Sequence, residues 1–157
     1  MSSVPTTLCY IRRGKDILFI IKASKGNMND GLWLGIGGHI EKGESPEECI
    51  IREIGEETGI EPAELSGLRQ RGIVYFENDR CDDETMYVFE AEYTGSKDVT
   101  SYPCDEGELR WADVKDVYGL PIWEGDKEIF KCLFESCENF TLKLIYEGYD
   151  LVKTVRL

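Results

Sequence analysis

Basic residues are scarce in this 157-residue chain. Its 18 lysines and arginines stand against 31 aspartates and glutamates, which gives a formal net charge of −13. Such a surplus of negative charge repels the phosphates of nucleic acids and anionic membrane surfaces. We therefore expect neither a nucleic acid polymer nor a membrane as a partner. An anionic small molecule remains possible where a divalent cation screens the carboxylates.

Long apolar runs and paired cysteines are also missing. The longest apolar stretches are about five residues, whereas a membrane-spanning helix needs about 20. The six cysteines form no CxxC pair. Cys132 and Cys137 are five apart on a predicted helix and face different ways, so we expect neither a disulfide nor a zinc site between them. Because the first residues show no basic segment followed by a long apolar run, we expect reduced thiols in a cytoplasmic protein.

No repeat, linker or low-complexity segment divides the chain. Its composition, 41% hydrophobic and 31% charged, is typical of globular proteins. The length suits one core of ordinary size and is too short for two. We expect a single domain over residues 1–157.

Short segments rich in β-branched and aromatic residues predict strands. Thr6–Ile11 and Ile17–Ala23 flank the polar segment RRGKD and predict a hairpin. Further strands are predicted in LWLGI, in GIVYFEN at 72–78, in ETMYVFEAEY at 84–93, in ELRWADV, which leads into a helix start, and in FTLKLIY and LVKTVRL, a terminal hairpin around EGYD.

Two segments carry helical signals. Ser45 can cap a first turn with proline at its first position, and Gly59 provides a stop, so Pro46–Thr58 is predicted as a helix. The spacing of apolar residues predicts a second helix over Gly125–Ser136. Strands interrupted by two such helices predict an α/β fold: a mixed β-sheet in an α/β/α sandwich, ending in a β-hairpin.

The first helix carries an acidic row beside an apolar one. Ile50, Ile51 and Ile54 share one stripe, and Glu53, Glu56 and Glu57 occupy the neighbouring arc. Most charge runs are solvated helix faces. Three carboxylates within two turns nevertheless repel one another, which helix stability alone would not favour. Hard oxygen ligands of this kind suit Mg²⁺, with Mn²⁺ as a possible substitute.

A longer motif surrounds this row. Gly38, Glu44 and the segment from Arg52 to Ile60 fit the pattern G-x5-E-x7-R-E-U-x-E-E-x-G-U, where U is aliphatic, at all nine specified positions. The segment resembles the Nudix box, and the chain is identified as a member of the Nudix hydrolase family. This family cleaves nucleoside diphosphates linked to another group, so the resemblance implies a Nudix fold and a metal-dependent pyrophosphohydrolase.

The resemblance also implies roles for individual box residues. Glu53, Glu56 and Glu57 are expected to bind the metals together with the backbone carbonyl of Gly37. Arg52, a catalytic candidate as well, and Glu44 are expected to hold the preceding loop on the helix.

The remaining catalytic candidates lie outside the box or compete with it. A further acidic ligand is expected on a loop, where Glu106 in CDEGELRW is the best match and Asp105 and Glu108 are rivals. Glu53 is favoured as the general base, with Glu106 as the alternative. Lys22 matches a basic position that contacts phosphate in relatives; an ordinary surface lysine is the competing interpretation.

Beyond the box the chain resembles the MutT-type branch, which removes oxidised purine nucleotides such as 8-oxo-dGTP from the nucleotide pool and so serves DNA repair. In that branch a tryptophan at the position of Trp123 stacks on the base and an acidic residue just after it, here Asp126, bonds the purine edge. Trp123 could equally be a core residue. Leu34 stands where mammalian members have asparagine, and Gly125 replaces the first of two aspartates. Gly38 completes the predicted substrate-binding set.

Three functions follow from these residues. The first is Mg²⁺-dependent hydrolysis of a nucleoside triphosphate, such as 8-oxo-dGTP, to the monophosphate and pyrophosphate. The second is hydrolysis of ADP-ribose or another nucleoside diphosphate conjugate. The third is a Nudix-fold module that senses a nucleotide without cleaving it; such a module would usually lack part of the carboxylate set, which is complete here. The sequence leaves the oligomeric state open.

Overall fold

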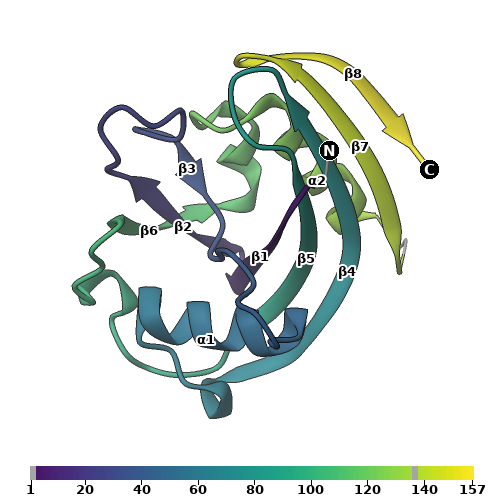
Figure 1. The fold of residues 1–157 in the computed structure, drawn as a ribbon. Helices are drawn as coiled ribbons and strands as arrows, with labels where there is room; N and C mark the ends of the chain where they lie inside the picture. Colours follow the sequence, from purple (N-terminus) through teal and green to yellow (C-terminus); the bar gives the residue numbers. More distant parts are fainter. Residues whose placement is uncertain (1–2, 136–137) are drawn as a thin grey trace.

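A computed structural model describes residues 3–135 and 138–157 of the chain (Figure 1). Eight strands and two α-helices follow one another along these residues. The strands are β1 (Val4–Arg13), β2 (Asp16–Lys22), β3 (Trp33–Leu34), β4 (Leu65–Asn78), β5 (Glu84–Tyr93), β6 (Gly107–Asp113), β7 (Phe140–Glu147) and β8 (Asp150–Arg156). The helices are α1 (Pro46–Thr58) and α2 (Glu124–Phe134), with short 3₁₀ turns at η1 (Pro62–Glu64), η2 (Val99–Ser101) and η3 (Val114–Gly119).

The strands form one mixed sheet in the order β3-β2-β1-β5-β4-β7-β8, and β6 pairs with β2. The hairpin predicted from Thr6–Ile11 and Ile17–Ala23 exists only next to its turn, where Arg12 and Arg13 pair with β2. Over the rest of its length β1 runs parallel to β5, and β2 pairs with β6 instead. The sheet therefore splays between β1 and β2, because β1 makes most of its pairs with β5 and β2 makes most of its pairs with β6.

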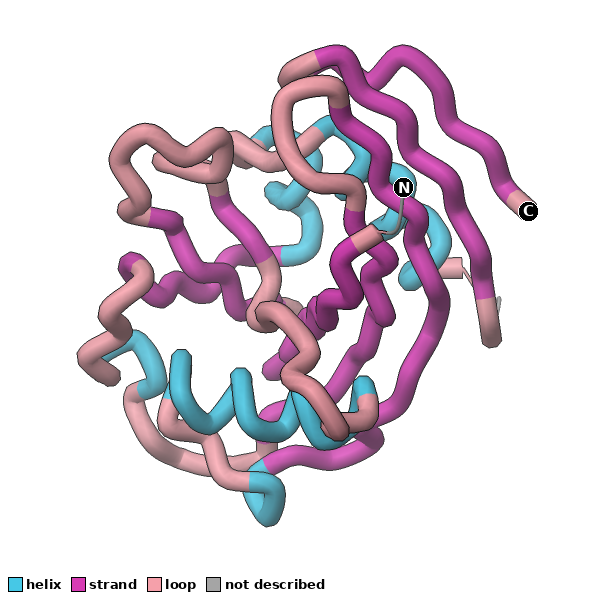
Figure 2. Tube along the Cα trace, in the orientation of Figure 1, coloured by secondary structure: helices cyan, strands magenta, loops and turns pink. Residues whose placement is uncertain are grey.

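Both faces of the strands are buried, so the chain has two apolar clusters rather than one. Ile17 and Phe19 belong to the cluster around α2, whereas Leu18 and Ile20 belong to the cluster around α1. Alternation of this kind sends successive side chains to opposite faces of a strand. Figures 1 and 2 show the two helices on opposite sides of the strands. The predicted α/β/α arrangement and the terminal hairpin of β7 and β8 are confirmed.

Helix α1 has the predicted bounds, set by a cap at each end. Ser45 accepts a hydrogen bond from the backbone N–H of Glu48, whose side chain accepts one from Ser45 N–H in return. Gly59 adopts a left-handed conformation with φ of 72°, which glycine adopts without a Cβ penalty. Ile50 and Ile54 are fully buried. Burial of this apolar face places the acidic row on the adjoining face of the helix.

Other boundaries differ from the expectation. Strand β4 begins at Leu65, seven residues before the predicted start at Gly72. Its first half carries exposed polar side chains and irregular register against β5, so its sequence lacks the alternation that signals a strand. Helix α2 spans Glu124–Phe134, and the predicted end at Ser136 and the expectation for Cys137 fall outside the described residues. Among the described helices, none is long and apolar enough to cross a membrane.

Because Ile54 anchors α1 in the core, replacing it should destabilise the whole fold. We expect Ile54→Ala to lower the free energy of unfolding by about 2–5 kcal/mol, through lost burial and the cavity left behind. The matched control is Val152→Ala on β8, where the side chain is 51% exposed. This substitution should change the free energy of unfolding by no more than about 0.5 kcal/mol. Denaturant unfolding measures both. Equal effects would contradict the packing described for α1.

Candidate active site

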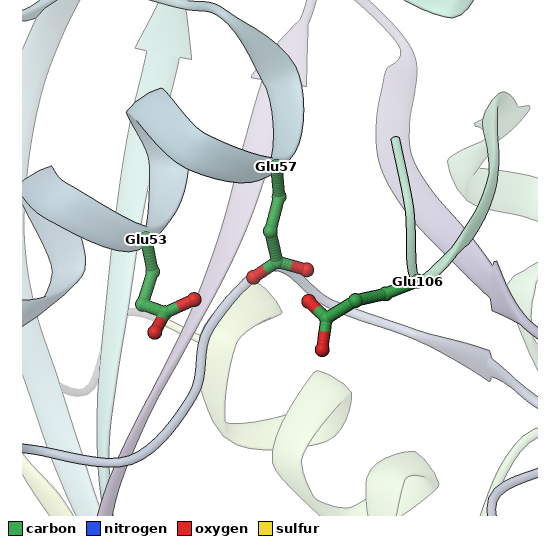
Figure 3. A group of neighbouring side chains, drawn as sticks. All are labelled: Glu53, Glu57 and Glu106. Atoms are coloured by element: carbon green, nitrogen blue, oxygen red, sulfur yellow. The ribbon is translucent and has the colours of Figure 1, made fainter. Parts of the chain in front are cut away.

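Three carboxyl groups meet beside α1. Glu53 and Glu57 project from the same side of the helix, and Glu106 reaches toward them from the loop before β6 (Figure 3). One oxygen from each lies within 4.8 Å of the others. Glu106 is positioned by the neighbouring strand, since its carbonyl accepts the N–H of Ala23 at 3.0 Å. The pairing of β2 with β6 thus brings the loop glutamate to the helix.

Glu57 lies deepest of the three. The residue is only 3% exposed. Its Oε1 accepts the N–H of Gly37 at 3.2 Å, while Oε2 has no hydrogen-bond partner among the described residues. Burial, followed by the charge of Glu106 and then that of Glu53, raises the pKa of Glu57 to about 9. A buried carboxyl with an unmatched oxygen beside two others is a set of donors that a divalent cation would satisfy.

The glycines before α1 let the backbone approach the cluster. A Cβ at Gly37 would collide with the carbonyl oxygen of Thr7, and one at Gly38 would lie 2.6 Å from Oε1 of Glu53. The N–H of Thr7 donates to the carbonyl of Gly38 at 2.9 Å, which fixes the segment against β1. At Gly37 the obstacle is the backbone of β1, so only glycine fits there, whereas a side chain at position 38 would displace the carboxylate of Glu53.

Arg52 ties this loop to the helix. Its guanidinium donates two hydrogen bonds to Glu44, at 2.7 and 3.0 Å, and one to the carbonyl of His39 at 3.1 Å. It also donates to Oε1 of Glu53 at 2.9 Å. The hydrogen bonds that Glu44 accepts from Arg52, and after them the one from the N–H of Glu41, lower the pKa of Glu44 to about 2. Arg52 therefore orients the carboxylate of Glu53 and holds the loop that faces it.

The other acidic candidates lie away from the cluster. The side chain of Glu56 is 61% exposed and its Oε2 lies 3.3 Å from Arg52. Asp105 is exposed, and Glu108 pairs with Arg110 at 3.2 Å on the solvent side of β6. Of the three loop candidates, the structure brings only Glu106 to Glu53 and Glu57. The metal-binding role predicted for Glu56 remains a prediction.

A cleft of about 650 Å³ connects the carboxylates with an aromatic pocket. Lys22 lines it at the carboxylate end, where its Nζ lies 3.4 Å from Oε1 of Glu106. All of the predicted substrate-binding residues line this one cleft: Lys22, Leu34, Gly38, Trp123 and Asp126.

Trp123 forms part of the far wall and part of the core. It is 8% exposed and packs edge-on against Phe76 and Tyr146, with ring centroids 5.6 and 5.1 Å away. Its indole N–H donates to Oδ1 of Asn29 at 2.8 Å. The two interpretations of this tryptophan are compatible, because the buried ring also lines the cleft.

Asp126 is a buried carboxyl at this end of the cleft, and Glu84, which pairs with Phe76 across β4 and β5, lines the same cleft. Burial raises the pKa of Asp126 to about 7. Its neighbour Gly125 donates its N–H to the hydroxyl of Tyr146 at 2.6 Å. A Cβ at Gly125 would lie 2.5 Å from that hydroxyl and 2.6 Å from Leu144. A side chain at position 125 would therefore require Tyr146 and Leu144 to shift.

Several cleft residues were not predicted from the sequence. Phe76, Met86 and Tyr146 line the cleft from β4, β5 and β7, but strand alternation marks them only as core residues. Asn29 lies in the loop between β2 and β3, where asparagine is an ordinary loop residue. No signal in the sequence connects it with Trp123, 94 positions away.

Comparison with known proteins assigns the class. The NUDIX domain model matches residues 3–133, and the chain belongs to the Nudix family. It is a Nudix hydrolase that acts on nucleotide-like substrates.

Particular relatives refine this assignment. An uncharacterised Nudix hydrolase of Bacillus subtilis, YvcI, is 34% identical over 135 residues, which cover 83% of this chain and 78% of that protein. The NAD-capped RNA hydrolase NudC of Chromobacterium violaceum is 28% identical, and the match covers 75% of this chain but only 41% of NudC. A crystal structure of the mutator MutT protein from Bacillus halodurans superimposes with a TM-score of 0.81 at 26% identity, covering 98% of this chain and 97% of that one.

The raised pKa of Glu57 predicts how stability depends on pH in the metal-free protein. Its folded-state pKa of about 9 exceeds the ordinary value of 4.5, so the folded state holds a proton that the unfolded state releases. This contribution to stability is complete below pH 4.5 and is lost as the pH rises through 9. In EDTA, the melting temperature of the parent should therefore fall from pH 6 to 9 more than that of Glu57→Gln.

The control is Glu92→Gln, which removes an exposed carboxylate on β5. Its melting temperature should follow that of the parent at every pH. Parallel curves for the parent and Glu57→Gln would show that Glu57 is not protonated in the folded protein.

Proposed function

We propose that this enzyme hydrolyses a purine nucleoside triphosphate, such as the oxidised nucleotide 8-oxo-dGTP, to the monophosphate and pyrophosphate, with Mg²⁺ as cofactor and Mn²⁺ as a substitute. One observation supports this above all: a single cleft joins Glu53 and Glu106, two members of the three-carboxylate cluster, to an aromatic pocket that contains the buried acid Asp126. Polyphosphate and base can thus be held at the same time.

The metal would be held by Glu53, Glu57 and Glu106, with the carbonyl of Gly37 and, as the family pattern implies, Glu56. A bound divalent cation neutralises phosphate charge and lowers the pKa of water. The unmatched oxygen of Glu57 supports this assignment. Lys22 adds a positive charge beside Glu106 and lines the same cleft, so it can contact the phosphates there.

The chemical step needs a base and an oriented water. Glu53 accepts the proton of the water, and Glu106 is the alternative base. The water oxygen bonds to the β-phosphorus while the bond from that phosphorus to the α-β bridging oxygen breaks. The nucleoside monophosphate leaves, and pyrophosphate keeps the new oxygen. Arg52 holds Oε1 of Glu53 at 2.9 Å, which leaves the other oxygen to face the water.

The aromatic pocket recognises the base. Contact of a base with the ring of Trp123, which lines the cleft, tolerates different purines, so polar contacts carry the discrimination. Asp126, with a pKa near neutrality, can donate or accept at the purine edge. Leu34 and Gly125 contribute no polar side chain to it.

A second candidate is hydrolysis of a nucleoside diphosphate conjugate such as ADP-ribose. The NudC relatives favour it, because their name records hydrolysis of NAD-capped RNA. The chain spans about two fifths of NudC. A nucleotide sensor without activity is disfavoured by the complete carboxylate set.

A substrate panel with Mg²⁺ tests the proposal. We expect kcat/KM to be highest for 8-oxo-dGTP and dGTP, lower for dATP, and lowest for ADP-ribose and NADH, with all activity lost in EDTA. In ¹⁸O-labelled water the label should appear in pyrophosphate. Label in the monophosphate would place the attack at the α-phosphorus, and a preference for ADP-ribose would establish the second candidate instead.

Glu53→Gln should lower kcat by about 10²–10⁴-fold, the range expected for loss of a general base, while the protein stays folded because the change relieves repulsion in the cluster. Glu92→Gln, far from the cleft, serves as the control and should keep the parental kcat. Steady-state rates and melting temperatures measure the two effects separately. A kcat within a few-fold of the parent would remove Glu53 from the mechanism.

A further inference from the structure

The side chain of Asn29 has a fixed orientation at the base end of the cleft. An indole N–H can only donate a hydrogen bond, so the atom that accepts it from Trp123, at 2.8 Å, must be the amide oxygen of Asn29. The amide nitrogen then necessarily lies on the other side of the group. Asn29 is half-buried and lines the cleft.

The loop around Asn29 is well supported. The backbone N–H of Asn29 donates to Oδ1 of Asn27 at 2.8 Å, and its carbonyl accepts the N–H of Leu32 at 2.9 Å. The hydroxyl of Tyr149, at the turn of the terminal hairpin, donates to the carbonyl of Met28 at 2.8 Å. The loop that arches between β2 and β3 (Figure 2) is thus held on both sides of Asn29. This reduces the entropy lost when a ligand binds there.

The amide nitrogen of Asn29 has no hydrogen-bond partner within residues 3–135 and 138–157. Asn29 lines the cleft beside Trp123 and its oxygen is occupied by the indole, so this NH₂ group is a preset donor in the cleft wall. We propose that Asn29 is a specificity-determining residue whose amide NH₂ donates to the oxygen at position 6 of a purine. The inference rests on the proposed function and deepens it.

The chemistry of the purine edge gives the direction of the preference. Guanine carries an acceptor oxygen at position 6, whereas adenine carries an amino group that donates. A donor that faces another donor in a partly buried site leaves both without a partner, and such mismatches discriminate strongly. Asn29 therefore favours 6-oxopurines, including 8-oxoguanine, over 6-aminopurines.

The substitution Asn29→Asp isolates this donor, because aspartate keeps an oxygen for the indole N–H and replaces the NH₂ by an acceptor. The test is binding of dGMP and dAMP, measured by titration calorimetry at pH 8. We expect the parent to prefer dGMP, and Asn29→Asp to lower the ratio of the two affinities by about tenfold or more. Any repulsion of phosphate by the new charge acts on both ligands and cancels in the ratio.

Two further variants serve as controls. Asp30→Asn changes a neighbouring charge but keeps an acceptor for the N–H of Ser24, which Asp30 binds at 2.9 Å, and should leave the ratio unchanged. Asn29→Ala, which also frees the indole, should weaken binding of both nucleotides and reduce the ratio. If Asn29 only supported Trp123, Asn29→Asp would keep the parental ratio, and that result would overturn the inference.

Failure of the proposed function would look different. A parent enzyme that hydrolyses ADP-ribose and no triphosphate would refute that function, yet the affinity ratio for the two monophosphates would still decide the role of Asn29. A parent that hydrolyses 8-oxo-dGTP, together with an Asn29→Asp variant of unchanged ratio, would leave the function standing and refute only the role of Asn29.

Discussion

Electrostatic repulsion among Glu53, Glu57 and Glu106 is the constraint on which the rest of this structure depends. Their oxygens lie within 4.8 Å of one another, and one of the three groups is almost fully buried. Like charges at such distances destabilise a fold unless protons or cations neutralise them. Much of the surrounding structure serves to hold the three groups together despite this cost.

Three features of the fold provide that support. Helix α1 is capped at both ends and anchored by Ile50 and Ile54, so it tolerates repulsion on its neighbouring arc. Arg52 places a positive charge between Glu44 and Glu53. The glycine segment supplies a backbone N–H to Glu57. None of these reaches the second oxygen of Glu57, which is where a cation is needed. Sites that work against local stability in this way are typical of functional centres.

The sequence predicts elements that nearby residues determine, but not contacts between residues far apart in the chain. Helix α1 and its acidic row follow from capping residues and spacing within about twenty positions, and the structure reproduces their bounds. The parallel pairing of β1 with β5 joins segments about eighty residues apart, and alternation along a strand does not specify its partner. The same limit hides the contact between Asn29 and Trp123. Glu106 could be preferred over Asp105 and Glu108 only through resemblance, because its position depends on the register of β2 and β6.

We expect the cluster to hold a proton on Glu57 until a divalent cation replaces it, since carboxylates must ionise to bind a metal. Calorimetric titration of Mg²⁺ into the metal-free protein at pH 7.5, repeated in buffers of different ionisation enthalpy, counts the protons released for each ion bound. The parent should release close to one proton for each Mg²⁺ bound, and Glu57→Gln almost none. Binding of Mg²⁺ to the parent without proton release, or equal release in the two proteins, would contradict this expectation.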